Sequence, residues 1–329
     1  MTIEKRTVDR LPYLDLAKGL LVVLMVFYHS LNYSSEYYLA FRYLSFLPPS
    51  FIFITGLLIS VVYPARYGSG DPRISRRLWI RGLKLLLLFT ALNIGVQFLQ
   101  PFPGDALLHL CQHLDEVYLS GGSRIAAFDV LLPIAYLLLL APTLLWAAFR
   151  HSALLPGITV ATLILCGVLE RNGYSFANLN LLSIGILGMY IGRLKVIRAD
   201  FIGRYLLLYV VLYLAYFPLA FYWGYNYYVQ LIGAFIAIAL VCGVGVRLGE
   251  SGWFQRRLII LGQYSLIAYI GQIAILQLLS RLFGRPLPWS PLFFLLFALT
   301  LVSMTLGIEA VRALRRKPLI DRAYKAVFA

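Results

Sequence analysis

Residues 10–30 read RLPYLDLAKGLLVVLMVFYHS, a polar opening followed by an apolar run that ends at His29 and Ser30. The run is long enough to cross the hydrocarbon core of a bilayer as a single helix. It is longer than the apolar core of a signal peptide and lacks a small-residue cleavage site, so we expect a retained helix. An ionisable group at membrane depth is costly, and His29 is therefore a candidate functional residue.

Similar apolar runs recur along the chain of 329 residues, of which 61% are hydrophobic and only 13% charged. Hydropathy divides the chain into about ten spans, near 11–32, 43–63, 79–99, 126–148, 152–169, 178–192, 202–222, 226–246, 258–279 and 288–311. The sequence therefore predicts an all-α integral membrane protein, a bundle of transmembrane helices forming a single domain over 1–329. The segment 312–329 is expected to be a basic cytoplasmic tail.

The formal net charge of +15 is distributed unevenly between alternate loops. One side has most of the basic residues, in segments 5–10, 66–84, 150, 193–204, 247–257 and 312–325, whereas the other has only Arg42, Arg124, Arg171, Arg281 and Arg285. The positive-inside rule then predicts that both termini are cytoplasmic. Topology and attraction to anionic headgroups explain the charge. Nucleic-acid binding is disfavoured, because no basic soluble domain remains to carry it.

Three ionisable residues of the first predicted helix, Asp15, Lys18 and His29, lie near one face, because successive residues turn by about 100°. At a rise of about 1.5 Å per residue, His29 lies roughly 21 Å from Asp15, too far for a hydrogen bond. We expect Asp15 to pair with Lys18 or with loop arginines, and Glu36 or Asp129 to orient the imidazole. The alternatives are a structural ion pair and a histidine that merely ends a span.

A stripe of cations marks the start of the third span, with the spacing i, i+4, i+8 and i+11: Arg73, Arg77, Arg81 and Lys84. Like charges on one helical face repel each other unless an anion neutralises them. Guanidinium groups pair bidentately with phosphate, so the stripe predicts a site for nucleotide phosphates. Ordinary loop charge or contact with lipid headgroups is the alternative.

Polar residues also follow one face of the ninth span, where Ser265, Tyr269 and Gln272 have the spacing i, i+4, i+7. They are either part of a site or hydrogen-bonding contacts between helices. In the loop over 101–124, His109 and His113 would share a face of a short helix. That pair suits a metal, but no third ligand is fixed by spacing, and a solvated loop helix is the favoured interpretation.

Together these motifs resemble the transmembrane acyltransferase superfamily, which holds the acyltransferase-3 enzymes and the heparan-α-glucosaminide N-acetyltransferase-like proteins. The opening motif of that family is matched by Arg10, Leu14-Asp15, Lys18-Gly19 and His29. Segments 49–59, 73–84, 180–194 and 262–272 resemble its later motifs. There are departures, because Lys18 and Lys84 replace the usual arginines. Gln272 replaces a late histidine, which leaves a hydrogen-bonding role there but puts proton transfer in doubt.

The resemblance implies an acyltransferase that moves an acyl group from cytoplasmic acyl-CoA to a hydroxyl of a cell-surface or lipid-linked glycan on the outer side. An acetyl group is the expected acyl group. His29 would act as general base or, alternatively, as the nucleophile of an acyl-imidazole. Tyr269, Gln272, Ser265 or Asn93 would donate hydrogen bonds to the oxyanion, and Asp129 would orient His29. The donor would contact the basic stripe together with Arg10, Asp15 and Lys18.

The expected donor substrate is acetyl-CoA or another acyl-CoA, with no tightly bound cofactor and no metal. The expected location is a bacterial inner membrane, with polysaccharide-biosynthesis proteins as possible partners. Two other classes of protein remain open, a carrier and a scaffold subunit. Charged residues within spans also mark transport pathways, which suit a lipid-linked sugar flippase or a small-solute permease. A scaffold subunit of a polysaccharide synthase would not need His29 at all.

Overall fold

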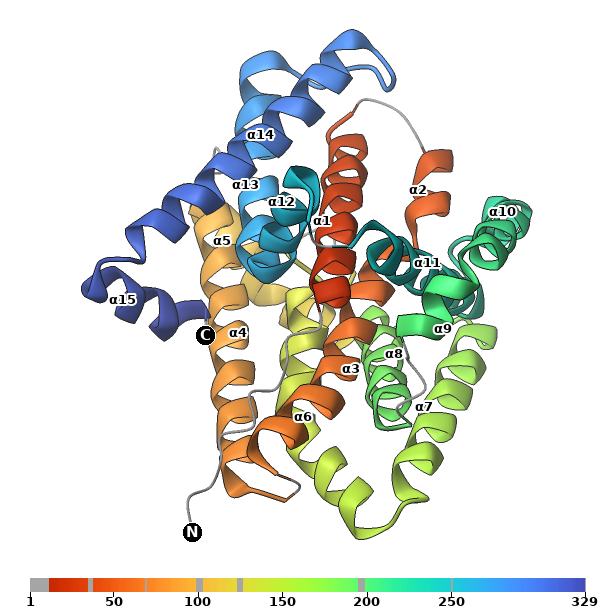
Figure 1. Cartoon of the computed structure of the whole chain (residues 1–329). Coiled ribbons are helices and arrows are strands. Elements are labelled where there is room, and N and C mark those ends of the chain that lie inside the picture. Colours follow the sequence, from red (N-terminus) through yellow and green to blue (C-terminus); the bar gives the residue numbers. More distant parts are fainter. Residues whose placement is uncertain are drawn as a thin grey trace. The chain divides into compact units, whose positions relative to one another are not determined.

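The computed structural model describes residues 12–34, 38–68, 70–98, 103–122, 127–194, 199–249 and 251–328. All regular elements within these ranges are helices, which confirms the predicted all-α class (Figure 1). In this part of the chain, nine helices are long and apolar enough to cross a membrane. The protein is therefore a multi-pass integral membrane protein. The span predicted over 178–192 forms a helix of 17 residues, Ala177–Arg193, which is not among the nine.

The chain divides into two compact units, and the boundary falls between Phe51 and Ile52, inside one helix. Unit 1 comprises residues 52–196 together with 1–9, and unit 2 comprises 10–51 and 197–329. The single domain expected from the sequence thus contains two centres of packing. Each unit is described separately below.

Unit 1 is built around helices that contact one another in the pairs α4–α6, α6–α8 and α7–α8. Its elements are most of α3 (Leu47–Tyr67), α4 (Pro72–Phe98), α5 (Pro103–Gln112), the π-helical turn η1 (Glu116–Ser120), α6 (Leu131–Arg150), α7 (Leu154–Arg171) and α8 (Ala177–Arg193). Helices α3 and α8 approach backbone to backbone, because a Cβ atom at Gly188 would collide with the carbonyl oxygen of Phe53. Small residues at such crossings are typical of helices packed in membranes.

Unit 2 is centred on the first helix, which contacts α11, α12, α13 and α14. Its elements are α1 (Pro12–Asn32), α2 (Tyr38–Leu44), the start of α3, α9 (Ala199–Arg204), α10 (Leu206–Trp223), α11 (Tyr227–Leu248), α12 (Trp253–Gln263), α13 (Ser265–Phe283), α14 (Pro291–Leu314) and α15 (Pro318–Phe328). Helix α14 begins with an N-cap, since the Ser290 hydroxyl accepts a hydrogen bond from the Phe293 N–H at 3.2 Å and Pro291 follows the cap.

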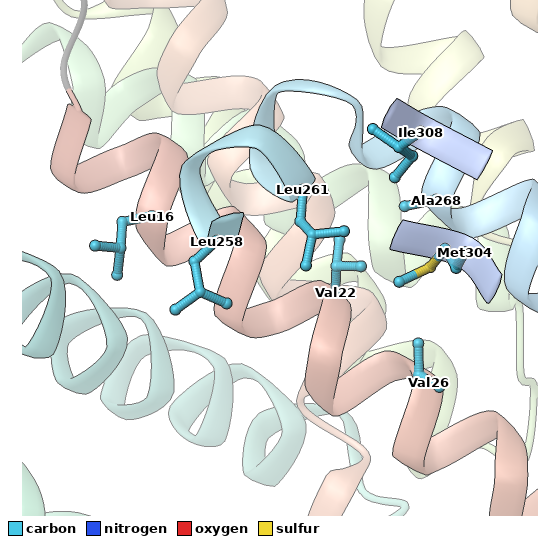
Figure 2. Packing of buried hydrophobic residues seen from close by; sticks show 8 residues of the cluster. All are labelled: Leu16, Val22, Val26, Leu258, Leu261, Ala268, Met304 and Ile308. Atoms are coloured by element: carbon cyan, nitrogen blue, oxygen red, sulfur yellow. The ribbon is translucent and has the colours of Figure 1, made fainter. Parts of the chain in front are cut away.

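Figure 2 shows the apolar core of unit 2, where side chains from four helices meet. The buried members are Leu16, Val22, Val26, Leu258, Leu261, Ala268, Met304 and Ile308. Helix α12 approaches α1 closely, because Cβ atoms at Gly19 and Gly262 would collide with the carbonyl oxygens of Leu258 and Asp15. These two glycines therefore fix the distance between α1 and α12.

The predicted span over 258–279 is wrong in one respect, because it is not one continuous helix. Its beginning belongs to α12, which ends at Gln263, and a new helix starts at Ser265. The segment Trp253–Gln263 includes Arg256, Arg257 and two glutamines, which are unfavourable in lipid. The apolar pattern of α12 reflects burial against α1, and only α13 is a candidate span.

Candidate active site

His29 lies near the end of α1, and its ring faces α13 within unit 2. The centroids of the His29 and Tyr269 rings are 6.0 Å apart, with an angle of 55° between the rings. The Tyr28 ring packs edge-on against the imidazole at 5.4 Å. The imidazole Nε2 is buried, and it has no hydrogen-bond partner among the residues that the structure describes. His29 is therefore held by aromatic contacts while one ring nitrogen stays uncommitted.

Gln272 lies on α13 one helical turn after Tyr269, and its side chain is completely buried, with a relative exposure of 0%. Neither its Oε1 nor its Nε2 atom has a hydrogen-bond partner within the described ranges. Each unsatisfied buried polar group costs about 1–3 kcal/mol, so such groups are rare in native proteins. The Gln272 side chain is therefore a buried donor and acceptor for which the described residues supply no partner.

The sequence correctly placed Ser265, Tyr269 and Gln272 on one helix, because all three belong to α13. Tyr269 is the member with a contact to the candidate base, through its ring. Ser265 is the first residue of α13 and directly follows the break at Tyr264. In unit 2 the structure thus brings His29 and Tyr269 into contact, and Gln272 follows Tyr269 by one turn on α13.

The two charged residues on the first turns of α1 form an ion pair. Lys18 Nζ lies 2.7 Å from Asp15 Oδ1, as predicted, and both side chains are largely buried. Gln263 of α12 also donates a long hydrogen bond of 3.4 Å to Asp15 Oδ2. Donor binding by Asp15 and Lys18 stays a prediction, and the observed contacts fit the alternative of a structural ion pair equally well. Arg10 and Glu36 lie outside the described residues.

The basic stripe belongs to unit 1, where it follows the first turns of α4. The Arg81 guanidinium donates a hydrogen bond of 2.7 Å to the hydroxyl of Tyr63. The Arg77 guanidinium lies over the ring of Tyr67, 4.8 Å from its centre. The sequence analysis identified the cations but missed these tyrosines. The spacing from Tyr63 to Tyr67, one helical turn at the end of α3, could have indicated them.

Asp129 precedes α6 in unit 1, and burial raises the pKa of its carboxyl to about 7. It belongs to a different unit from His29, so its predicted role in orienting the imidazole stays a prediction. Asn93 of α4, predicted as an oxyanion donor, is instead fully engaged. Its amide accepts a hydrogen bond from the Ala127 N–H at 2.7 Å and donates to the carbonyl of the same residue at 3.0 Å.

The histidine pair of the predicted outer loop lies at the end of α5. The rings of His109 and His113 are 4.3 Å apart, and His113 Nδ1 lies 2.8 Å from the carbonyl oxygen of His109. Within the described ranges, no group of three or more histidine, cysteine, aspartate or glutamate side chains is arranged to hold a metal. The pair is a local contact between two tilted rings, with an angle of 37° between them, at this helix end.

The sequence analysis also missed a cluster at the C-terminal end of unit 2. Arg315 donates hydrogen bonds to the Tyr264 hydroxyl at 2.8 Å and to Asp321 Oδ1 at 2.9 Å, and its guanidinium lies 3.9 Å from the Tyr324 ring centre. The basic tail is therefore attached through α15 to the break between α12 and α13. The sequence predicted a basic tail but not this attachment.

No protein-family model, no curated protein and no solved structure matches this chain.

Proposed function

We propose that this protein is an acyl-CoA-dependent acyltransferase, an O-acetyltransferase that modifies a hydroxyl of a cell-surface or lipid-linked glycan at a bacterial inner membrane. The observation that carries the proposal is the uncommitted imidazole nitrogen of His29, next to Tyr269 and in the same unit as the unsatisfied amide of Gln272. General bases and oxyanion donors are the groups that acyl transfer requires.

In the proposed reaction, His29 Nε2 takes the proton from the acceptor hydroxyl as its oxygen attacks the thioester carbonyl carbon. The negative charge that develops on the carbonyl oxygen is stabilised by hydrogen bonds from the Gln272 amide N–H and the Tyr269 hydroxyl. The intermediate collapses to the ester with cleavage of the carbon–sulfur bond. The thiolate of CoA leaves and receives the proton from the imidazolium, which restores neutral His29.

The exposure and charge of the basic stripe support acyl-CoA as the donor. Arg77 and Arg81 are exposed arginines of unit 1, and neither is paired with a carboxylate among the described residues. Guanidinium groups recognise phosphate bidentately, and CoA carries three phosphate groups. A hydroxyl acceptor is compatible with His29 as the base, because an alcohol oxygen becomes a strong nucleophile only as it loses its proton.

The test is the release of free CoA from acetyl-CoA by the protein purified in detergent, with a lipid-linked oligosaccharide as acceptor. We expect His29→Ala to abolish release and Arg81→Ala to raise KM for the donor with little change in kcat. His151→Ala is the matched control, because this exposed histidine follows α6 and is expected to leave release unchanged. If the wild type neither binds nor consumes any of a panel of acyl-CoAs, the proposal is wrong, and flux of lipid-linked sugar across proteoliposomes would then test the carrier interpretation.

A further inference from the structure

The end of α3 and the start of α4 form one basic and aromatic cluster in unit 1, here called the Tyr–Arg cluster: Tyr63, Arg66, Tyr67, Arg77 and Arg81. The Tyr67 ring has two guanidinium groups over it, that of Arg77 at 4.8 Å and that of Arg66 at 5.5 Å from its centre. Tyr63 accepts the hydrogen bond from Arg81, and the two tyrosine rings are 6.4 Å apart. Both rings are partly buried.

No carboxylate among the described residues is paired with the arginines of this cluster. All three of its arginines are exposed. In the described part of this segment, the single ion pair joins Asp71 to Arg73, at 3.9 Å, and the Arg73 side chain is still 80% exposed. Cation–π contacts to tyrosine stabilise exposed guanidinium groups only weakly and leave their charge in place. The cluster is therefore suited to a ligand with several negative charges.

An anion alone does not explain the tyrosine at the centre. A purine base is a flat aromatic surface that stacks on tyrosine, and guanidinium groups stack on the same surfaces and also bind phosphate. Tyr67 is followed by Gly68 and Gly70, which both have positive φ, and a Cβ atom added at either would have no neighbour within 4 Å. The main chain beside the ring is thus open to a ligand.

We propose that the Tyr–Arg cluster binds the nucleotide end of the donor, with Tyr67 stacking on the adenine and Arg77 and Arg81 pairing with the phosphates. This inference rests on the proposed acyl-CoA-dependent function and deepens it, because it assigns base recognition to one residue. Stacking on Tyr67 would distinguish a purine nucleotide from a phospholipid headgroup, because the headgroup offers phosphate but no base.

The test measures equilibrium binding of adenosine 3′,5′-bisphosphate and of pyrophosphate to the protein in phosphatidylcholine nanodiscs. We expect Tyr67→Ala to weaken nucleotide binding about tenfold, since stacking on one aromatic side chain contributes on that order. Tyr67→Phe should keep the affinity, because the ring stacks without its hydroxyl. Pyrophosphate binding should be unchanged by Tyr67→Ala and weakened by Arg77→Gln.

Tyr225→Ala is the matched control, because the Tyr225 ring also carries an arginine, Arg42 at 5.6 Å, but belongs to unit 2. It should leave both affinities unchanged. Undiminished nucleotide binding by Tyr67→Ala, an equal loss for pyrophosphate, or no nucleotide binding by the wild type would overturn the inference. In a second arm, nanodiscs with anionic phosphatidylglycerol should compete weakly; if this lipid abolishes binding of the nucleotide, the cluster is a headgroup site.

Failure of this inference can be told apart from failure of the proposed function. Binding is measured without turnover, so a Tyr67-dependent nucleotide site in a protein that consumes no acyl-CoA would contradict only the enzyme proposal. Conversely, His29-dependent release of CoA that accompanies unchanged nucleotide binding by Tyr67→Ala would contradict only the assignment of Tyr67.

Discussion

Two buried amides, one in each unit, have opposite surroundings. Asn93 of unit 1 bonds to both main-chain groups of Ala127 and also donates to the carbonyl of Phe89 at 3.0 Å. Gln272 of unit 2 is more deeply buried, yet neither of its polar atoms has a partner among the described residues. The first amide joins a loop to a helix, and the second makes no contribution to stability that the structure reveals.

Under the proposed function, the first amide is a structural group and the second a functional one. A satisfied amide stabilises the fold, and its removal leaves main-chain groups unpaired. An unsatisfied amide destabilises the fold, so its removal should be harmless to stability and harmful only to function. Substitution of Asn93 should therefore lower stability and leave activity unchanged. Substitution of Gln272 should lower activity without lowering stability.

The largest expected effect is on activity, at Gln272. Gln272→Met keeps the size of the side chain but removes the donor, so we expect kcat to fall about 10²–10³-fold, or roughly 3–4 kcal/mol. The melting temperature should stay the same or rise, because two unsatisfied buried atoms are removed. Measurements of CoA release and thermal unfolding on the same preparation check both effects.

Gln277→Met is the control on the same helix, and it should leave kcat unchanged. Full activity of Gln272→Met would show that the amide is not an oxyanion donor. A large drop in melting temperature would instead mean that Gln272 stabilises the helix bundle, and the contrast with Asn93 would disappear.

The next effect is on stability, at Asn93. Asn93→Leu removes three hydrogen bonds and leaves the N–H and C=O groups of Ala127 without this partner, so we expect a loss of about 2–3 kcal/mol. Activity per folded molecule should be unchanged. Thermal unfolding in detergent, with activity normalised to the folded fraction, tests this. A selective loss of kcat without a change in stability would restore the predicted catalytic role of Asn93.

A smaller effect concerns pH, at Asp129. Burial raises the pKa of this carboxyl to about 7 from its ordinary value of 3.8, so the folded protein holds a proton that the unfolded chain releases. The free energy of unfolding therefore falls as pH rises from about 4 to about 7. Asp129→Asn should remove this dependence and stabilise the protein at pH 8 by about 1–2 kcal/mol, allowing for partial solvent screening.

Melting temperatures of the wild type and Asp129→Asn at pH 5 and pH 8 test this linkage. The difference in melting temperature between the two proteins should be larger at pH 8 than at pH 5, because the free energy of unfolding of the wild type is still falling between these pH values. An equal difference in melting temperature at pH 5 and at pH 8 would show that Asp129 ionises normally. A loss of activity by Asp129→Asn at unchanged stability would favour the predicted role of Asp129 in orienting His29.

The sequence predicted the helical class, most spans and the face shared by Tyr269 and Gln272, because apolar length and helical period are local properties. It could not predict the break at Tyr264, since an apolar face buried against α1 resembles a lipid-facing one in composition. The unsatisfied state of Gln272 depends on neighbours distant in sequence. The contacts of Tyr67 likewise depend on how α3 and α4 pack.

The smallest expected effect is on the stability of unit 2, where the partly exposed Arg315 connects α15 to Tyr264. Its side chain is partly exposed, so the interaction is screened by solvent, and we expect a coupling of about 0.5–1 kcal/mol between Arg315 and Tyr264. A double-mutant cycle with Arg315→Gln and Tyr264→Phe, read by thermal unfolding, measures it.

The contribution of Arg315, Tyr264 and Asp321 to stability depends on pH, unlike that of the two buried amides. Hydrogen bonds from Lys325 and Arg315 lower the pKa of the Asp321 carboxyl, so its contribution is complete above the ordinary pKa of aspartate and is lost as pH falls through the lowered value. The coupling between Arg315 and Tyr264 should weaken in acid and in high salt, because Asp321 positions the guanidinium that binds Tyr264. A coupling that is insensitive to both would mean that stacking on Tyr324, which does not depend on charge neutralisation, holds Arg315 in place.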